Sequence, residues 1–113
     1  MKYNYLGNSG VRVSALGLGT NAFGSRADDK TSINIIHQAL DLGINFIDTA
    51  NKYSDTESER IIGNALVCRR HEAVLATKVG LVRGKGPNEK GSSRLHTELL
   101  VRVNLFRIWF SSC

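Results

Sequence analysis

Three side chains capable of acid–base chemistry follow apolar runs of this sequence. Asp48 follows INFI, Tyr53 lies in the polar turn beyond it, and Lys78 follows AVLAT. A phenol has a pKa of about 10 in water and is a poor proton donor at neutral pH. A neighbouring ammonium lowers the pKa of a phenol, and a carboxylate keeps the ammonium charged. An acid, an amine and a phenol held together would therefore serve as a general acid for a carbonyl oxygen that becomes an alkoxide.

Each of these residues also has an ordinary structural explanation. An aspartate at a strand end commonly forms a turn, and a lone tyrosine commonly packs half-buried. A lysine at a strand end commonly extends its amine to water. The catalytic hypothesis therefore depends on the elements that would bring the three side chains together.

The order of elements predicted after the first 14 residues is strand, helix, strand, helix, strand. The strands are SALGLGT, INFID and AVLATKVG, and the helices run over 30–42 and from about residue 56. This alternation predicts a parallel sheet with crossover helices, an α/β fold. In such folds the carboxyl ends of the strands meet at one rim, where functional groups gather. The three side chains are expected there, with Gly19 and Thr20 at the end of the first strand.

Local signals refine this outline. Residues 3–13 predict a hairpin whose strands are joined by GNSG. Asp28 or Asp29 is suited to cap the first helix. Thr56 and Glu59 match a capping box at the start of the second helix. The sequence after residue 96 is ambiguous, because VRVNL alternates like a strand while other positions fit an apolar helical stripe. The positions of that stripe are Leu99, Val103, Phe106 and Phe110.

Composition narrows the class of protein. The chain has 113 residues, 42% of them hydrophobic, and a formal net charge of +5, which fits one small globular domain. Its basic residues are scattered and lack interleaved aromatic residues, so we expect no nucleic-acid partner. The sequence shows no apolar leader and no run of 18 apolar residues, so we expect no membrane partner and a cytoplasmic location.

One rival site is visible in the sequence. GLGTNA, over residues 17–22, matches the G-x-G-x-x-A fingerprint of a Rossmann dinucleotide site. That fingerprint has to open directly into a helix, whereas FGSRADD intervenes here. We therefore expect no Rossmann site.

Three longer segments resemble the start of an aldo-keto reductase, in the bacterial branch related to the potassium-channel β subunits. They are LGNSGVRVSALGLGTNAFG, HQALDLGINFIDTANKYSDTESERIIGNAL and VLATKVG. The resemblance divides the chain into a partial reductase domain over 1–96 and a divergent tail over 97–113. It implies the N-terminal part of a (β/α)8 barrel, with about three βα units after a β-hairpin. It also implies that a small-molecule aldehyde or ketone is reduced with NADPH.

The resemblance assigns roles to the residues of the rim. It implies that Tyr53 is the proton donor, that Lys78 makes the phenol a better acid, and that Asp48 pairs with Lys78. It places Gly19 and Thr20 near the nicotinamide end of the cofactor.

Other positions complete the implied site only in part. The resemblance places Asn21 and Phe23 along the substrate pocket, and it implies no metal. The fourth catalytic residue of the family is a histidine at the end of the fourth strand. His37, His71 and His96 do not stand at that position and are expected at the surface.

A complete barrel of this kind needs roughly 250 residues. We expect this chain to lack the family's fourth catalytic residue and its loops for the cofactor's phosphate and adenine. The family pattern stops near Thr97, as a change of reading frame, or a chimeric or truncated gene, would cause. We expect marginal stability, self-association through exposed sheet edges, and no catalysis by this chain alone. The alternative is a non-catalytic barrel fragment that associates with a partner chain or has no independent function.

Overall fold

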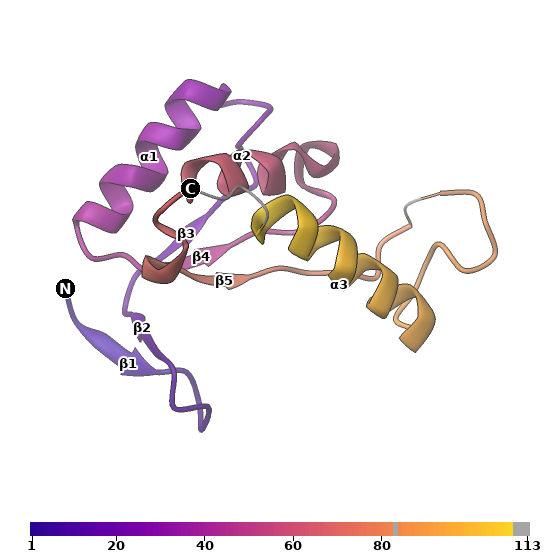
Figure 1. The fold of residues 1–113 in the computed structure, drawn as a ribbon, viewed down its shortest axis with the longest axis horizontal. Helices are drawn as coiled ribbons and strands as arrows, with labels where there is room; N and C mark the ends of the chain where they lie inside the picture. Colours follow the sequence, from indigo (N-terminus) through magenta and orange to yellow (C-terminus); the bar gives the residue numbers. More distant parts are fainter. Residues whose placement is uncertain (83, 110–113) are drawn as a thin grey trace.

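A computed structural model describes residues 1–82 and 84–109, and their side chains as far as residue 104. The chain opens with the predicted hairpin. Strands β1 (Tyr3–Tyr5) and β2 (Arg12–Ser14) pair antiparallel. In Figure 1 this hairpin lies apart from the other strands. It is tied to them by Asn45, whose side-chain oxygen accepts a hydrogen bond from the Ser14 N–H at 2.7 Å.

The site is positioned by a parallel sheet with the strand order β3, β4, β5. The strands span Gly17–Gly19, Phe46–Asp48 and Val74–Ala76. Gly19 pairs in register with Asp48, and Asp48 with Ala76. The three strands therefore end level with one another, and their carboxyl ends form the single rim that the sequence predicts.

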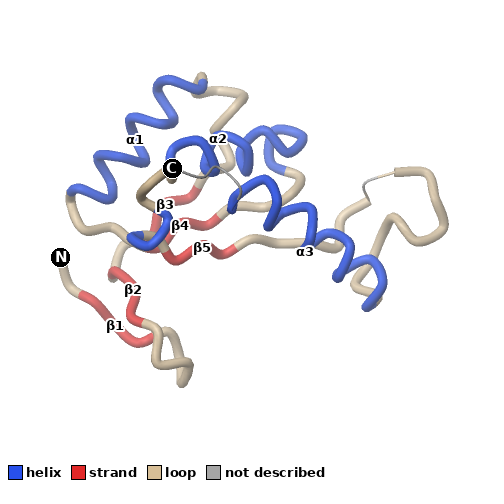
Figure 2. The backbone as a smooth tube through the Cα atoms, in the orientation of Figure 1, coloured by secondary structure: helices blue, strands red, loops and turns tan. Residues whose placement is uncertain are grey.

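Helices cover one face of this sheet (Figure 1). They are α1 (Asp29–Asp41) and α2 (Glu57–Ala65), and a third helix, α3 (Arg94–Trp109), lies beside α2. Short 3-10 turns, η1 (Tyr53–Thr56) and η2 (Arg70–Glu72), precede α2 and β5 (Figure 2). α2 packs against both α1 and α3. The strand–helix alternation confirms the predicted α/β fold.

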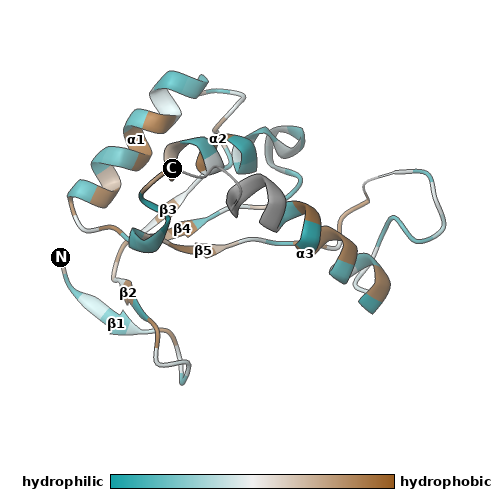
Figure 3. Cartoon of the chain, in the orientation of Figure 1, coloured by the Kyte–Doolittle hydropathy of each residue, from teal (hydrophilic) through white to brown (hydrophobic). Residues whose placement is uncertain are grey.

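The core lies between α1, α2 and the sheet, where each helix carries an apolar stripe along one side (Figure 3). Ile36 and Ile62 are fully buried and Leu40 is nearly so, which fixes the side of each helix that faces the core. The full cluster of buried residues is Phe23, Ile36, Leu40, Ile47, Ile61, Ile62, Ala65, Leu66 and Ala73.

The ends of α1 follow from its sequence. Asp28 is the N-cap, and its carboxylate accepts a hydrogen bond from the Thr31 N–H at 2.8 Å. That bond holds the pKa of Asp28 below its ordinary value. Gly43 follows the helix with a φ of +85°, a conformation in which glycine has no Cβ penalty. The predicted helix over 30–42 is therefore confirmed to within one residue at each end.

The predicted capping box at the start of α2 is wrong. Thr56 is the N-cap, but it has a left-handed φ of 79° and its side chain makes no capping hydrogen bond. Glu59 is fully buried and accepts a hydrogen bond from the Thr77 hydroxyl at 2.8 Å. An N-cap residue that forms such a box usually has an extended backbone, whereas Thr56 is left-handed.

The ambiguous C-terminal sequence is helical as far as Trp109. α3 crosses the proposed boundary between residues 96 and 97, and Ser93 caps it by accepting from the N–H of His96. The predicted stripe is wrong at Leu99, which is 56% exposed, while Leu100 is buried. Phe106 and Phe110 of that stripe lie outside the described side chains.

Candidate active site

The rim brings together the acid, the amine and the phenol that the sequence separates by 30 residues. Asp48 is the last residue of β4, and Lys78 follows β5 by two residues. Lys78 Nζ donates to both carboxylate oxygens of Asp48, at 2.7 and 2.8 Å. The same ammonium lies 5.1 Å from the centroid of the Tyr53 ring. The predicted proximity of the three groups is therefore confirmed.

Lys78 is held in a charged state. It is partly withdrawn from water, and that burial by itself lowers its pKa. The hydrogen bond to Asp48 and the interaction with Tyr53 outweigh burial, so the pKa of Lys78 lies above its ordinary value. The side chains of Lys78 and Asp48 stay 51% and 42% exposed. The pair is therefore open to a ligand from the solvent side.

A buried cluster of hydroxyls supports the rim from below. Thr20, Thr49 and Ser58 are all fully buried. Ser58 Oγ lies 2.9 Å from Thr20 Oγ1 and 3.0 Å from Thr49 Oγ1, so it joins β3, β4 and α2. Lys78 Nζ also donates to the carbonyl oxygen of Thr49 at 2.8 Å. The cluster therefore fixes the backbone against which the ammonium is placed.

The hydrogens of this cluster can be assigned. The Thr20 hydroxyl lies 2.9 Å from the carbonyl oxygen of Asp48, which can only accept, so Thr20 donates there. Ser58 then donates to Thr20, whose carbonyl and hydroxyl oxygens both lie within 3.0 Å. Thr49 in turn donates to Ser58. Each hydroxyl has a donor role, so the cluster carries no unsatisfied buried group.

Ser58 and Thr49 were not among the residues that the sequence singled out. One signal for Ser58 was present, because it precedes Ile61, Ile62 and Ala65 at helical spacing and so belongs to the buried stripe of α2. A serine on such a stripe needs a buried partner. Thr49 had no comparable signal beyond its place after Asp48.

The two residues predicted to bind the cofactor differ in their environment. Gly19 is exposed, and a Cβ added to it would meet nothing within 4 Å, so open space lies above this point of the rim. Thr20 is fully buried, and its hydroxyl is engaged with Asp48 and Ser58. Thr20 therefore shapes the rim, and its side chain is not presented to a ligand.

The residues predicted to line a substrate pocket are also separated. Asn21 is exposed beside the rim, whereas Phe23 is 3% exposed and packs in the hydrophobic core. The loop that carries them ends at Asp28, so β3 does not open directly into a helix. This loop confirms that GLGTNA is no Rossmann fingerprint.

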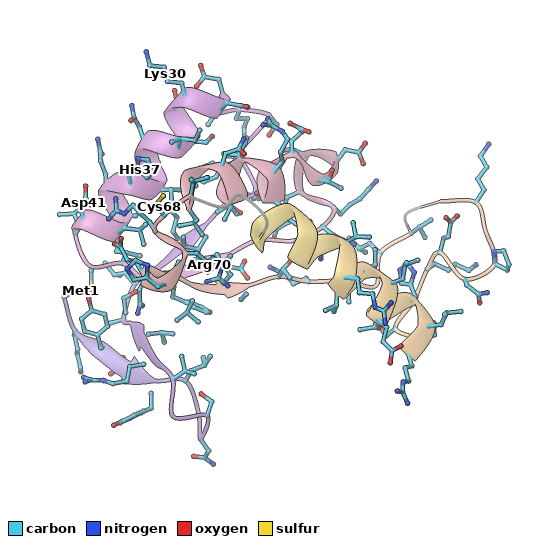
Figure 4. The ribbon with its side chains drawn as sticks, viewed as in Figure 1. Met1, Lys30, His37, Asp41, Cys68 and Arg70 are labelled. Carbon is cyan, nitrogen blue, oxygen red and sulfur yellow. The ribbon has the colours of Figure 1, made fainter. Side chains whose placement is uncertain are left out.

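The histidines lie away from the rim. His37 stands on α1, labelled in Figure 4, and its Nε2 lies 2.8 Å from the carbonyl oxygen of Ala65 at the far end of α2. His71 is exposed, as predicted. His96 is 2% exposed, so the predicted surface position is wrong for it. It lines a small cavity together with Glu89, Leu100 and Val103.

The described residues form neither of two other kinds of site. Among them, no group of three or more His, Cys, Asp or Glu side chains is placed to hold a metal ion. None of the described helices combines the length and apolar character needed to cross a bilayer. A cytoplasmic location stays a prediction from the sequence.

Asp48, Lys78 and Tyr53 lie together at the carboxyl rim of a parallel βα sheet. Comparison with known proteins gives the family: residues 15–103 match the model of the aldo/keto reductase family. The chain belongs to this family, and its fold is the N-terminal portion of the (β/α)8 barrel.

The relatives show the extent of the match. The chain is 39% identical over 112 residues to a probable voltage-gated potassium channel subunit beta of rice, Oryza sativa subsp. japonica. It is 42% identical over 87 residues to the aldo-keto reductase YhdN of Bacillus subtilis. The holo form of aldo-keto reductase AKR11C1 from Bacillus halodurans superposes with a TM-score of 0.83 at 36% identity, over 96% of this chain.

The match covers only part of each relative. The chain spans 34% of the rice protein, 26% of YhdN and 36% of AKR11C1.

Proposed function

We propose that this chain supplies the proton-transfer end of an NADPH-dependent carbonyl reductase, with Tyr53 as the proton donor to an aldehyde or ketone. The observation that carries the proposal is the contact of Lys78 with both oxygens of Asp48, 5.1 Å from the centroid of the Tyr53 ring. Membership of the aldo/keto reductase family supports the same chemistry.

The rim residues fit the nicotinamide end of NADPH in one respect. Gly19 leaves open space beside Asp48, where a flat ring would find no side chain in its way. Gly19 and the backbone of Thr20 would hold that end of the cofactor. When bound, NADPH supplies a hydride to the carbonyl carbon of the substrate.

The chain's own residues handle the proton. The Tyr53 hydroxyl donates its proton to the carbonyl oxygen as that oxygen gains negative charge. Lys78 is protonated at neutral pH, and Asp48 helps to raise its pKa above the ordinary value. Its charge near the ring stabilises the phenolate left on Tyr53. Asp48 therefore acts through Lys78 and does not touch the substrate.

A chimera tests this proposal. Residues 1–96 replace the matching third of AKR11C1, so that this rim is completed by a known reductase barrel. We expect the folded chimera to consume NADPH in the presence of an aldehyde, and Tyr53→Phe to abolish that turnover. Tyr5→Phe, on the exposed hairpin, is the matched control and should leave turnover unchanged. A folded chimera without turnover would contradict the proposal.

A second candidate is favoured by the short span of the match. A chain covering about a third of its relatives would be a non-catalytic fragment when it is alone. Within the described residues, the order β3, β4, β5 leaves one side of β3 and one side of β5 without a partner strand, and such edges favour self-association. Sedimentation of the isolated chain, together with titration by NADPH, tests this candidate. A monomer that reduces aldehydes by itself would rule it out.

A further inference from the structure

The backbone directly after Tyr53 is left-handed at three consecutive residues, none of them glycine. Their φ and ψ angles are 49° and 39° at Ser54 and 52° and 51° at Asp55, and φ is 79° at Thr56. L-residues disfavour this region because Cβ crowds the following carbonyl oxygen. Such a run persists only where the surrounding structure holds it.

The turn joins two fixed points. At one end the ring of Tyr53 lies beside Lys78 at the half-exposed rim. At the other end Ser58 is fully buried and bonded to Thr20 and Thr49. Only four residues separate the two ends. The left-handed turn takes the chain from the rim into the core within that length.

Gly24, in the loop after β3, is packed against this turn. A Cβ added to Gly24 would lie 2.7 Å from Cβ of Glu57 and 3.4 Å from Cβ of Ser54. The atom at 2.7 Å belongs to the first residue of α2 and is next to its backbone, so it cannot move aside by a side-chain rotation. The missing side chain therefore gives the start of α2 and the left-handed turn the room they occupy.

We propose that Gly24 is a positioning residue for Tyr53. The close approach that it allows keeps the strained turn in place, and the turn keeps the phenol beside Lys78. A side chain at residue 24 would push the start of α2 outward, let the turn relax, and carry Tyr53 away from the ammonium. This proposal rests on the proposed function for the role of Tyr53, but the contact itself can be measured without turnover.

The experiment compares two glycine substitutions with the same backbone cost. Gly24 has a φ of +78° and Gly10, in the hairpin turn, has a φ of +76°, yet a Cβ at Gly10 would meet nothing within 4 Å. The readout is the nuclear Overhauser contact between the Tyr53 ring and the Lys78 side chain in the isotope-labelled chain. We expect Gly24→Ala to lose most of that cross-peak and Gly10→Ala to keep it.

A double variant separates positioning from general damage. Gly24→Ala with Glu57→Gly moves the Cβ from one side of the contact to the other, so the Tyr53–Lys78 cross-peak should return. Glu57→Gly alone controls for the loss of the Glu57–Arg60 ion pair. If Gly24→Ala does not fold, the double variant decides.

Two results would overturn the proposal: a full cross-peak in Gly24→Ala, or its absence in the double variant. Failure of the proposed function looks different. In that case the cross-peak responds as described, while the chimera with AKR11C1 consumes no NADPH.

Discussion

At the rim of the sheet the buried hydroxyls of Thr20, Thr49 and Ser58 all take part in hydrogen bonds. On α3 the buried side chains of His96 and Asn104 have no hydrogen-bond partner within the described part of the chain. Both sets are at most 2% exposed. The two regions therefore bury polar groups to the same degree but compensate for that burial very differently.

The difference shows whether the described elements supply the hydrogen-bond partners and the packing that each region needs. The rim cluster is closed by β3, β4 and α2 alone. α3 contacts α2, but it leaves Leu95 and Leu99 largely exposed. His96 lines a cavity of about 210 Å³ with Glu89, Leu99, Leu100 and Val103. We infer that the geometry of the site is determined within residues 17–78, whereas α3 contributes little to it.

The largest expected effect compares the cores of the two regions. Ile61 on α2 is fully buried in the main cluster, whereas Leu99 on α3 is 56% exposed. Ile61→Ala removes packed methyl groups and should lower the free energy of unfolding by about 2–5 kcal/mol. Leu99→Ala should change it by less than about 0.5 kcal/mol. Urea unfolding followed by circular dichroism measures both, and equal losses would mean that α3 packs as tightly as α2.

The next effect tests the satisfied cluster at the rim. Ser58→Ala removes the hydroxyl that joins Thr20 to Thr49 and leaves buried oxygens without a partner. We expect a loss of about 1–3 kcal/mol in the free energy of unfolding. Ser92→Ala, at an exposed serine, is the control and should be nearly neutral. An unchanged midpoint for Ser58→Ala would show that the hydroxyl network does not stabilise the rim.

A change of opposite sign is expected on α3. His96→Leu replaces a buried polar ring that lacks a protein partner with an apolar side chain facing Leu99 and Leu100. The free energy of unfolding should rise by about 1–2 kcal/mol, because an unpaired buried polar group is costly. His71→Leu, at an exposed position, should leave it almost unchanged. Destabilisation by His96→Leu would mean that the imidazole has a partner and that the two regions are alike.

Much of the molecule could be predicted because the local rules agree with the fold. The bounds of α1 follow from Asp28 as cap, the apolar stripe, and Gly43. The convergence of Asp48 and Lys78 follows from parallel strands that end at one rim. These predictions needed only periodicity, caps and strand order.

The parts that could not be predicted depend on backbone angles and on neighbours. The left-handed run after Tyr53 contains no glycine, so the residue types of YSDT did not predict it. The predicted capping role of Thr56 was wrong because Thr56 belongs to that run. Phe23 was placed by resemblance beside a pocket, yet its ring packs in the core. The buried face of α3 is decided by its contact with α2, which its own periodicity does not reveal.

The smallest expected effect concerns the exposed part of the rim, the pair of Asp48 and Lys78. The pKa of Lys78 is raised, because the bond to Asp48 and the interaction with Tyr53 outweigh burial, which alone would lower it. A raised pKa gives a stabilisation that is fully present below the ordinary value of 10.5 and is lost as the pH rises through the raised value. Since both side chains are about half exposed, we expect Asp48→Asn to cost less than about 1 kcal/mol at neutral pH.

The pair can be followed directly by nuclear magnetic resonance titration of the Lys78 side chain. Asp48→Asn should lower the pKa of Lys78, because it removes the main interaction that offsets the effect of burial. Asp41→Asn is the matched control, because Asp41 is 65% exposed and pairs with Arg69 at 2.8 Å, away from the rim. It should leave the titration of Lys78 where it is. The same titration in both variants would mean that Asp48 does not raise the pKa of Lys78, and the pairing role given to Asp48 would be wrong.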